Sequence, residues 1–150
     1  MVLPAIFFFY HRTTLPAEQP IPTAEALQMP PDPRIAQLNK FFDHYKCKEP
    51  RYVNEYLSSA DKYQIPFMLL PAISIIESTC GQHQRFNNWW GYWSDTHGFT
   101  DVPAGIDYVS SQLAGGRHFV NLSIEAKLYN YGPHTSSYVS KVVQLINQIK

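Results

Sequence analysis

Apolar residues recur at three- and four-residue steps along most of the chain after residue 32, and this spacing predicts amphipathic helices. The first helix should begin at Asp32-Pro33, because Asp caps a helix and Pro fits its first turn, and it should end near Lys46. Pro50 is expected to open the second helix. Three later segments show the same periodicity: residues 101–115, 123–131 and 136–149.

The segment that begins at Pro66 is apolar nearly all round, which is typical of a helix buried in the core. Pro71 cannot donate a backbone hydrogen bond, so a kink or a start in a tighter turn is expected there. Gly81 should end this helix in the left-handed conformation. Residues 82–101 mix Gly, Asn and Asp with aromatic residues, which predicts loops and a short β-hairpin. The expected fold is therefore mostly α (α+β), with about six helices around a central buried helix and one small β-hairpin.

The first 32 residues have a different composition. Val2–Tyr10 is strongly apolar, but it is shorter than the roughly 20 residues that span a bilayer. The prolines of Thr13–Pro33 then forbid regular helix and favour extended chain. We interpret residues 1–32 as an N-terminal tail or linker and residues 33–150 as the folded domain. A tether to a membrane or cell wall and a plain terminal tail both stay open as interpretations of the first segment.

Composition narrows the class of function. The 12 basic and 12 acidic residues leave no positive surplus that would attract nucleic acid. Aromatic residues make up 15% of the chain, and five large rings fall within residues 86–93. Flat rings with a polar edge suit the apolar face of a sugar, so this cluster points to a carbohydrate site. The six His residues show no ligand spacing, and neither a metal nor another cofactor is expected.

The two cysteines, Cys47 and Cys80, belong to no CxxC pair, which argues against a structural zinc site. One disulfide and two buried free thiols are both consistent with the sequence. A disulfide would suit an exported protein. A catalytic thiol at Cys80 is a third interpretation, although no partner base is evident.

Glu77 is the sharpest candidate for chemistry. It follows Ile75 and Ile76 inside the apolar helix, where burial disfavours the charged carboxylate and raises its pKa. A carboxylic acid that is protonated near neutral pH can donate its proton to a glycosidic oxygen. On these residues alone, a structural Glu that caps or pairs locally explains the position equally well.

The motifs ESTCGQH, at 77–83, and NNWWGYW, at 87–93, resemble those of the lysozyme-like superfamily, specifically bacterial endo-β-N-acetylglucosaminidases of the flagellar and autolysin type. Those proteins carry a helix-terminal Glu-Ser-x-x-Gly-Lys and then an Asn-Asn-aromatic-x-Gly-aromatic turn. Here Gln82 stands where Lys is usual.

Two later segments extend the resemblance. YVSKV, at 138–142, resembles that family's Tyr-Ala-x-Lys-Val helix, and LYNYGP, at 128–133, is similar to the Ala-Tyr-Asn-Ala-Gly-Pro motif of the related lytic transglycosylases. The likeness covers about residues 34–150. Each motif alone is only moderately specific, whereas four in the same order are a much stronger signal.

The resemblance implies a lysozyme-like fold and a peptidoglycan glycoside hydrolase of the glucosaminidase or muramidase type. It would cleave β-1,4 bonds between N-acetylglucosamine and N-acetylmuramic acid, with Glu77 as the general acid. Asp95 is the favoured second carboxylate, whereas Asp101 is better explained as a helix cap. Tyr129 matches the family tyrosine that orients the acid, and a core tyrosine explains it comparably well. The expected substrate contacts are Asn88, Trp89, Trp90, Tyr92 and Trp93, with turn formation as the alternative for Asn88.

Other functions fit the same residues. A lytic transglycosylase needs no second acid, because the sugar's own 6-hydroxyl or N-acetyl group completes the reaction and leaves an anhydro sugar. A wall-binding module without turnover and an intracellular helical interaction domain are further alternatives. The expected partner is peptidoglycan or a chitooligosaccharide-like glycan, and no nucleic acid. The protein is expected to be an exported monomer in the cell envelope or outside the cell.

Overall fold

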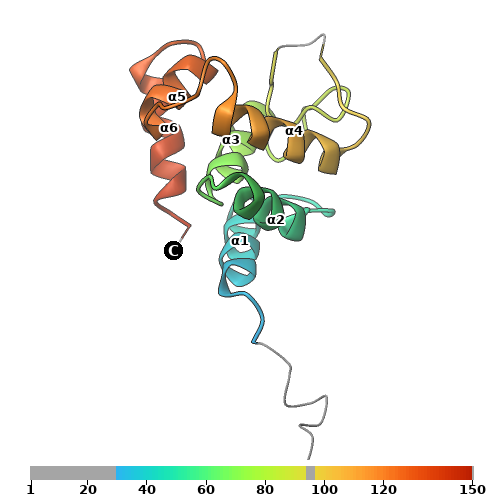
Figure 1. Ribbon diagram of the computed structural model, residues 1–150. Helices are drawn as coiled ribbons and strands as arrows, with labels where there is room; N and C mark the ends of the chain where they lie inside the picture. Colours follow the sequence, from blue (N-terminus) through green and yellow to red (C-terminus); the bar gives the residue numbers. More distant parts are fainter. Residues whose placement is uncertain (1–29, 94–96, 150) are drawn as a thin grey trace, which may run out of the picture. The chain divides into compact units, whose positions relative to one another are not determined.

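The computed structural model describes residues 30–93 and 97–149, and the described residues are mostly helical, as predicted. Pro31–Lys150 groups into one compact unit. Almost all of the predicted tail, residues 1–32, lies outside the described residues. Among those that are described, no helix has the length and apolar character needed to cross a membrane. The helices are α1 (Pro33–His44), α2 (Val53–Tyr63), α3 (Leu69–Ser78), α4 (Val102–Gly115), α5 (Ile124–Tyr131) and α6 (Ser136–Ile146) (Figure 1).

Polar side chains cap four of these helices, because they bond backbone N–H groups that have no partner inside the helix. Asp32 accepts from the Arg34 N–H at the start of α1, at 2.9 Å, which confirms the predicted start. Three further caps begin α4, α5 and α6; they are Asp101, Ser123 and Thr135.

The start of α2 differs from the prediction. The helix begins at Val53 and not at Pro50, because Tyr52 has a left-handed backbone with φ 53° that cannot belong to a right-handed helix. The connection that precedes it is held by Arg51, whose guanidinium pairs with Asp43 at 2.7 Å and with Glu49 at 2.9 Å.

The central helix is α3, as the apolar segment predicted. It packs against α4 and α6, while α2 packs against α1 and α4 (Figure 1). Leu69, Ala72 and Ile73 have no exposed surface. Pro71 lies in the first turn, where its missing N–H costs no hydrogen bond. The helix stops at Ser78, next to the predicted end near Thr79-Cys80-Gly81, and Gly81 is left-handed as expected, with φ 80°.

The predicted β-hairpin within residues 82–101 is wrong. The described part of this segment contains only an isolated bridge between Arg85 and Asn88. Phe86 and Asn87 have φ values of 55° and 60°, which no extended strand can accommodate. Side chains hold the loop instead: the Asn87 amide donates to the carbonyls of Phe99 and Thr100, at 3.1 and 3.2 Å.

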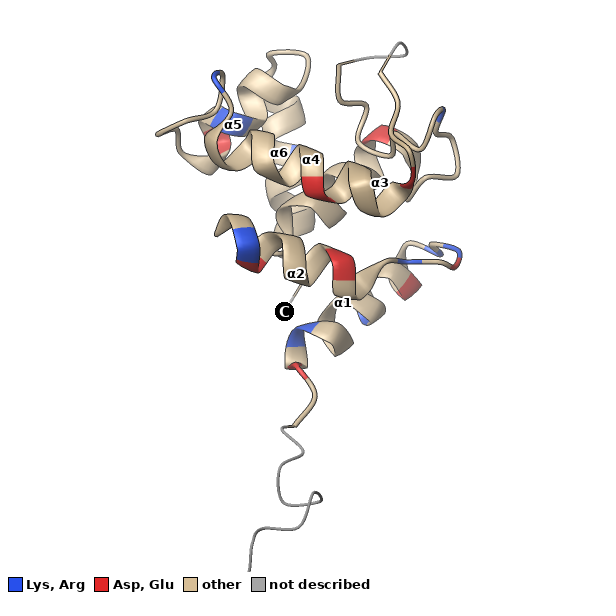
Figure 2. Ribbon diagram, turned by 45° about the vertical axis from the view of Figure 1, so that its right-hand side comes forward, with Lys and Arg blue, Asp and Glu red and all other residues tan. Residues whose placement is uncertain are grey.

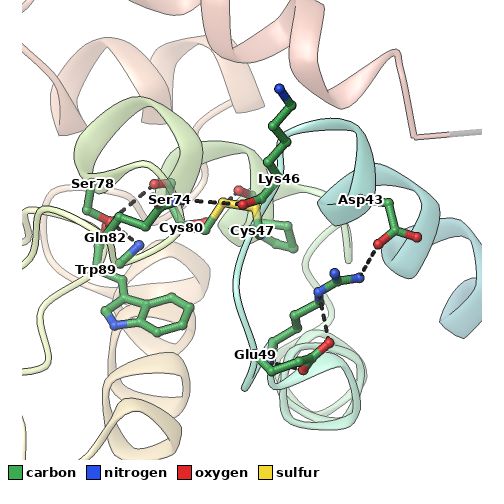
Figure 3. The surroundings of a disulfide bond; sticks show 12 residues. Asp43, Lys46, Cys47, Glu49, Ser74, Ser78, Cys80, Gln82 and Trp89 are labelled. Carbon is green, nitrogen blue, oxygen red and sulfur yellow. Dashed lines mark hydrogen bonds and ion pairs between the residues drawn. A yellow bond between two sulfur atoms is a disulfide. The ribbon is translucent and has the colours of Figure 1, made fainter.

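Cys47 and Cys80 form a disulfide, which decides between the interpretations left open by the sequence. Cys80 therefore carries no free thiol, and a catalytic role for it is wrong. The bond joins the segment after α1 to the turn after α3 (Figure 3). It closes a loop with a sequence separation of 33, and its constraint on the unfolded chain corresponds to about 4 kcal/mol. The end of α3 is thus fixed just beyond Glu77.

Charged residues of both signs are dispersed over the helices and loops, in keeping with the zero formal net charge (Figure 2). Several are paired. Arg34 bonds Asp61 at 2.6 Å, and Lys62 bonds Asp107 at 2.7 Å. These exposed pairs link neighbouring helices but each contributes only about 0–1 kcal/mol to stability.

Candidate active site

Glu77 lies in the last turn of α3, and its carboxyl group is packed between two other segments. The phenol of Tyr138, in the first turn of α6, donates a hydrogen bond of 2.7 Å to Glu77 Oε1. On the other side, a Cβ added at Gly91 would lie 2.8 Å from Glu77 Oε2. Gly91 also has φ 61°, so glycine satisfies both the turn and the close approach. The loop that carries Gly91, the end of α3 and the start of α6 therefore meet at the Glu77 carboxyl.

The surroundings of Glu77 favour its protonated form. The residue as a whole is exposed, but partial burial of its carboxyl group raises the pKa above the ordinary value. The hydrogen bond from Tyr138 opposes this effect, because it stabilises the carboxylate. Burial, followed by the nearby charge of Glu77, also raises the pKa of Tyr138, which keeps the phenol as a donor. Glu77 thus holds its proton to higher pH than an exposed glutamic acid.

Two pockets meet beside this carboxyl, and Gly91 lines both. We call the first the acid pocket; it measures about 310 Å³ and is lined by Glu77, Ser78, His83, Gln84, Arg85, Phe86, Asn88, Gly91 and His97. We call the second the aromatic pocket; it measures about 470 Å³ and is lined by Gly91, Tyr92, Trp93, His118, Phe119, Asn130, Tyr131 and His134. Both volumes fall in the range typical of small-ligand sites.

Only part of the predicted aromatic surface faces these pockets. Trp93 is 67% exposed and lines the aromatic pocket. Tyr92 lines it as well, although the ring is largely buried. Trp90 has no exposed surface, and Trp89 is buried against Gly81 and lines neither pocket. The Trp90 indole is therefore part of the core and has no surface to offer a sugar. Trp89 is largely buried and lines a separate pocket with Gly81 and Gln82, so its predicted sugar contact stays a prediction.

Asn88 lines the acid pocket, but its amide is committed to the backbone. The Nδ2 group donates to the carbonyls of Tyr92 and His97, at 2.8 and 3.0 Å, and Oδ1 accepts from the Tyr92 N–H at 3.1 Å. Both amide hydrogens are thus in use. The geometry favours the turn-forming interpretation of Asn88 over substrate contact.

The tyrosine next to the acid is Tyr138 and not Tyr129. Tyr129 is 46% exposed, and its ring lies against His134 at a centroid distance of 5.5 Å. In the sequence, Tyr138 is marked only by the motif YVSKV. Its place in the first turn of α6, soon after the Gly132-Pro133 turn, is the sequence feature that could have identified it as the partner of Glu77. Gly132 makes room for it, since a Cβ there would lie 2.5 Å from the Tyr138 ring.

The other candidate acids lie elsewhere. Asp95 falls outside the described residues. Asp101 caps α4 by accepting from the Ala104 N–H at 2.8 Å, as expected. Among the described residues that line the two pockets, Glu77 is the only acid. The described part of the chain also contains no group of three or more His, Cys, Asp or Glu side chains placed to hold a metal ion.

Comparisons of the chain with protein-family models, with curated proteins and with solved structures found no match. The chemistry of the site therefore has to be argued from its own residues. A carboxylic acid with a raised pKa lines one pocket of ligand-binding size, and a second pocket that shares Gly91 with it contains an exposed indole. Such an arrangement can protonate the oxygen that links two groups bound on either side.

Proposed function

We propose that this protein is a lysozyme-like peptidoglycan glycoside hydrolase that cleaves β-1,4 bonds between N-acetylglucosamine and N-acetylmuramic acid. The observation that carries the proposal is the position of Glu77, which lines the acid pocket with a raised pKa, a bond to Tyr138 and close packing against Gly91, the residue that both pockets share. The order of the four sequence motifs supports the same conclusion.

In the proposed reaction, Glu77 protonates the glycosidic oxygen as the bond breaks. The phenol of Tyr138 already donates to Oε1, so Oε2, beside Gly91, is the oxygen that carries the transferable proton. When that proton leaves, the same hydrogen bond stabilises the new carboxylate. Trp93 offers an exposed ring on which a sugar in the aromatic pocket can stack.

A lytic transglycosylase is the second candidate, and one observation favours it. Glu77 is the only acid among the described residues lining the pockets, so the positive charge that develops on the sugar has no protein carboxylate beside it unless Asp95 supplies one. A group of the substrate itself would then complete the reaction. Mass spectrometry of the products separates the two candidates, because hydrolysis leaves reducing ends and transglycosylation leaves anhydro ends.

We further propose that the protein is exported. The disulfide between Cys47 and Cys80 supports this location, because such bonds persist in oxidising compartments. Peptidoglycan, the proposed substrate, also lies outside the cytoplasm.

Digestion of purified peptidoglycan by a Glu77→Gln variant tests the catalytic role. Gln keeps the shape and the bond to Tyr138 but cannot donate the proton, so activity should fall at least about 100-fold while binding is retained. The matched control is Glu125→Gln, which removes an exposed acid from the first turn of α5 and should leave activity unchanged. Undiminished cleavage by the Glu77 variant contradicts the proposal. Binding without any cleavage by the wild type favours the wall-binding module.

A further inference from the structure

The two pockets that meet at Gly91 differ in their chemistry. The acid pocket is lined by a cationic residue, Arg85, and by the polar residues His83 and Gln84. The aromatic pocket contains neither Lys nor Arg among the described residues that line it, and its walls are mostly rings. A cation on that side, Arg117, lines a separate pocket that adjoins the aromatic pocket through Tyr92 and Trp93. Arg85 is therefore the arginine that shares a pocket with Glu77.

Arg85 is available to a ligand. It is exposed and makes no ion pair with any described residue. By contrast, the guanidinium groups of Arg34 and Arg51 are each occupied by carboxylates. The backbone position of Arg85 is fixed by its bridge with Asn88, whose N–H donates to the Arg85 carbonyl at 3.0 Å. Arg85, unpaired among the described residues, thus lies on a segment whose backbone is held in place.

An exposed ring lies next to this cation. Phe86 is 64% exposed and lines the same pocket. Its backbone carbonyl accepts from the Phe99 N–H at 2.9 Å, and Gly98 packs so closely that an added Cβ would lie 2.5 Å from Phe86 Cβ. A flat apolar surface beside a positive charge matches a sugar ring that bears a carboxylate.

Glu77 should repel a sugar carboxylate less than a fully exposed glutamate would. Burial keeps Glu77 toward its neutral form, so it adds less negative charge to the pocket. Among the described residues that line the acid pocket there is no other Asp or Glu. Arg85 is the only Lys or Arg among the same lining residues, so it is the group there that can pair with an anionic ligand.

We propose that the acid pocket selects the carboxylate-bearing sugar of the glycan through Arg85 and Phe86, while the aromatic pocket takes the neutral sugar. This inference rests on the proposed function and specifies its substrate. The carboxylate is either that of the lactyl ether on the muramic residue or that of the attached peptide; both present the same anion to the guanidinium. The protein should consequently prefer peptidoglycan fragments to neutral chitooligosaccharides of the same length.

Binding measurements test the inference independently of turnover. All variants carry Glu77→Gln, which prevents cleavage, and calorimetry gives Kd for soluble peptidoglycan fragments and for chitooligosaccharides. Arg85→Ala should weaken binding of the peptidoglycan fragments about fivefold, the upper range for an exposed ion pair, and leave chitooligosaccharide binding unchanged. Arg85→Lys should restore most of the loss, and added salt should reduce it. Lys141→Ala, an exposed cation on α6 that lines neither pocket, is the matched control.

Fragments with and without their peptides identify the anion. A loss that persists without peptides assigns it to the lactyl carboxylate, and a loss seen only with peptides assigns it to the peptide; either result supports the inference. Equal losses for acidic and neutral glycans, or no loss for either, overturn it. Turnover by the protein without the Glu77 substitution is measured separately, so a failure of the proposed hydrolase activity is recognised by itself.

Discussion

Trp90 and Trp93 are three residues apart, yet they belong to different regions of the molecule. Trp90 is fully buried, with its indole edge-on to Tyr56 and Phe99, whereas Trp93 is 67% exposed at the aromatic pocket. The backbone between them causes the difference. Gly91 and Trp93 have φ values of 61° and 57°, so the chain turns sharply and directs one ring to the core and the other to solvent.

The geometry of the site around Glu77 depends on how the core is packed. Gly91 follows Trp90 directly, and it is the residue that contacts the Glu77 carboxyl. Packing of the Trp90 indole therefore holds Gly91 against the acid. Tyr138 combines both roles, because its ring is buried while its hydroxyl reaches Glu77. The buried rings of Trp90 and Tyr138 determine where the Glu77 carboxyl lies, and the exposed ring of Trp93 is free to contact a ligand.

Trp90→Ala should have the largest effect on stability. Removing a fully buried indole leaves a cavity among Tyr56, Trp89 and Phe99, and the free energy of unfolding should fall by about 3–5 kcal/mol. Chemical denaturation of the wild type and the variant measures the change. A loss below about 1 kcal/mol would show that the indole is not part of a tightly packed core.

Tyr138→Phe should have a smaller effect on stability and a specific effect on pH dependence. The ring is kept, but the bond that stabilises the Glu77 carboxylate is lost, so the pKa of Glu77 should rise further. A general acid acts only while protonated, so the alkaline limb of the profile of kcat/KM against pH should move to higher pH. The pH profile, together with a carboxyl NMR titration, measures this shift. Movement of the limb to lower pH contradicts the assigned hydrogen bond.

Trp93→Ala should have the smallest effect on stability and act on binding instead. Because the ring is mostly exposed, the free energy of unfolding should change by no more than about 0.5 kcal/mol. Loss of a stacking surface should weaken glycan binding roughly fivefold. Denaturation and calorimetry on the same samples measure both quantities. A large loss of stability together with unchanged glycan binding would contradict the assignment of Trp93 to the binding surface and not to the core.

The local features of the fold were predictable. The starts of α1, α4 and α5 follow from a capping side chain and its neighbours, and a hydrogen bond across three residues needs no tertiary information. The buried helix α3 follows from its apolar composition. The same segment makes Glu77 a candidate acid, although the segment alone fits a structural Glu equally well and the later motifs tip the balance.

Apart from the start of α2, which depends on the left-handed backbone of Tyr52, the errors concern contacts between distant segments. The hairpin was expected from composition, but Asn87 bonds backbone groups of residues 99 and 100, and these long-range bonds replace a strand ladder. The motif around Tyr129 predicts a tyrosine beside the acid, but a motif does not say which tyrosine in the fold reaches it. That choice depends on how α6 packs on α3.

By itself, the sequence determined the helices, the buried position of α3 and the candidate acid, since periodicity and capping act within a few residues. Tertiary structure alone decided that Tyr138 bonds Glu77, that Gly91 closes against it, and that Trp90 is core while Trp93 is surface. It also joined Cys47 to Cys80, which the sequence left open. Each of these contacts joins residues from separate segments, and the pattern of residues along the sequence does not give the distance between such segments in the fold.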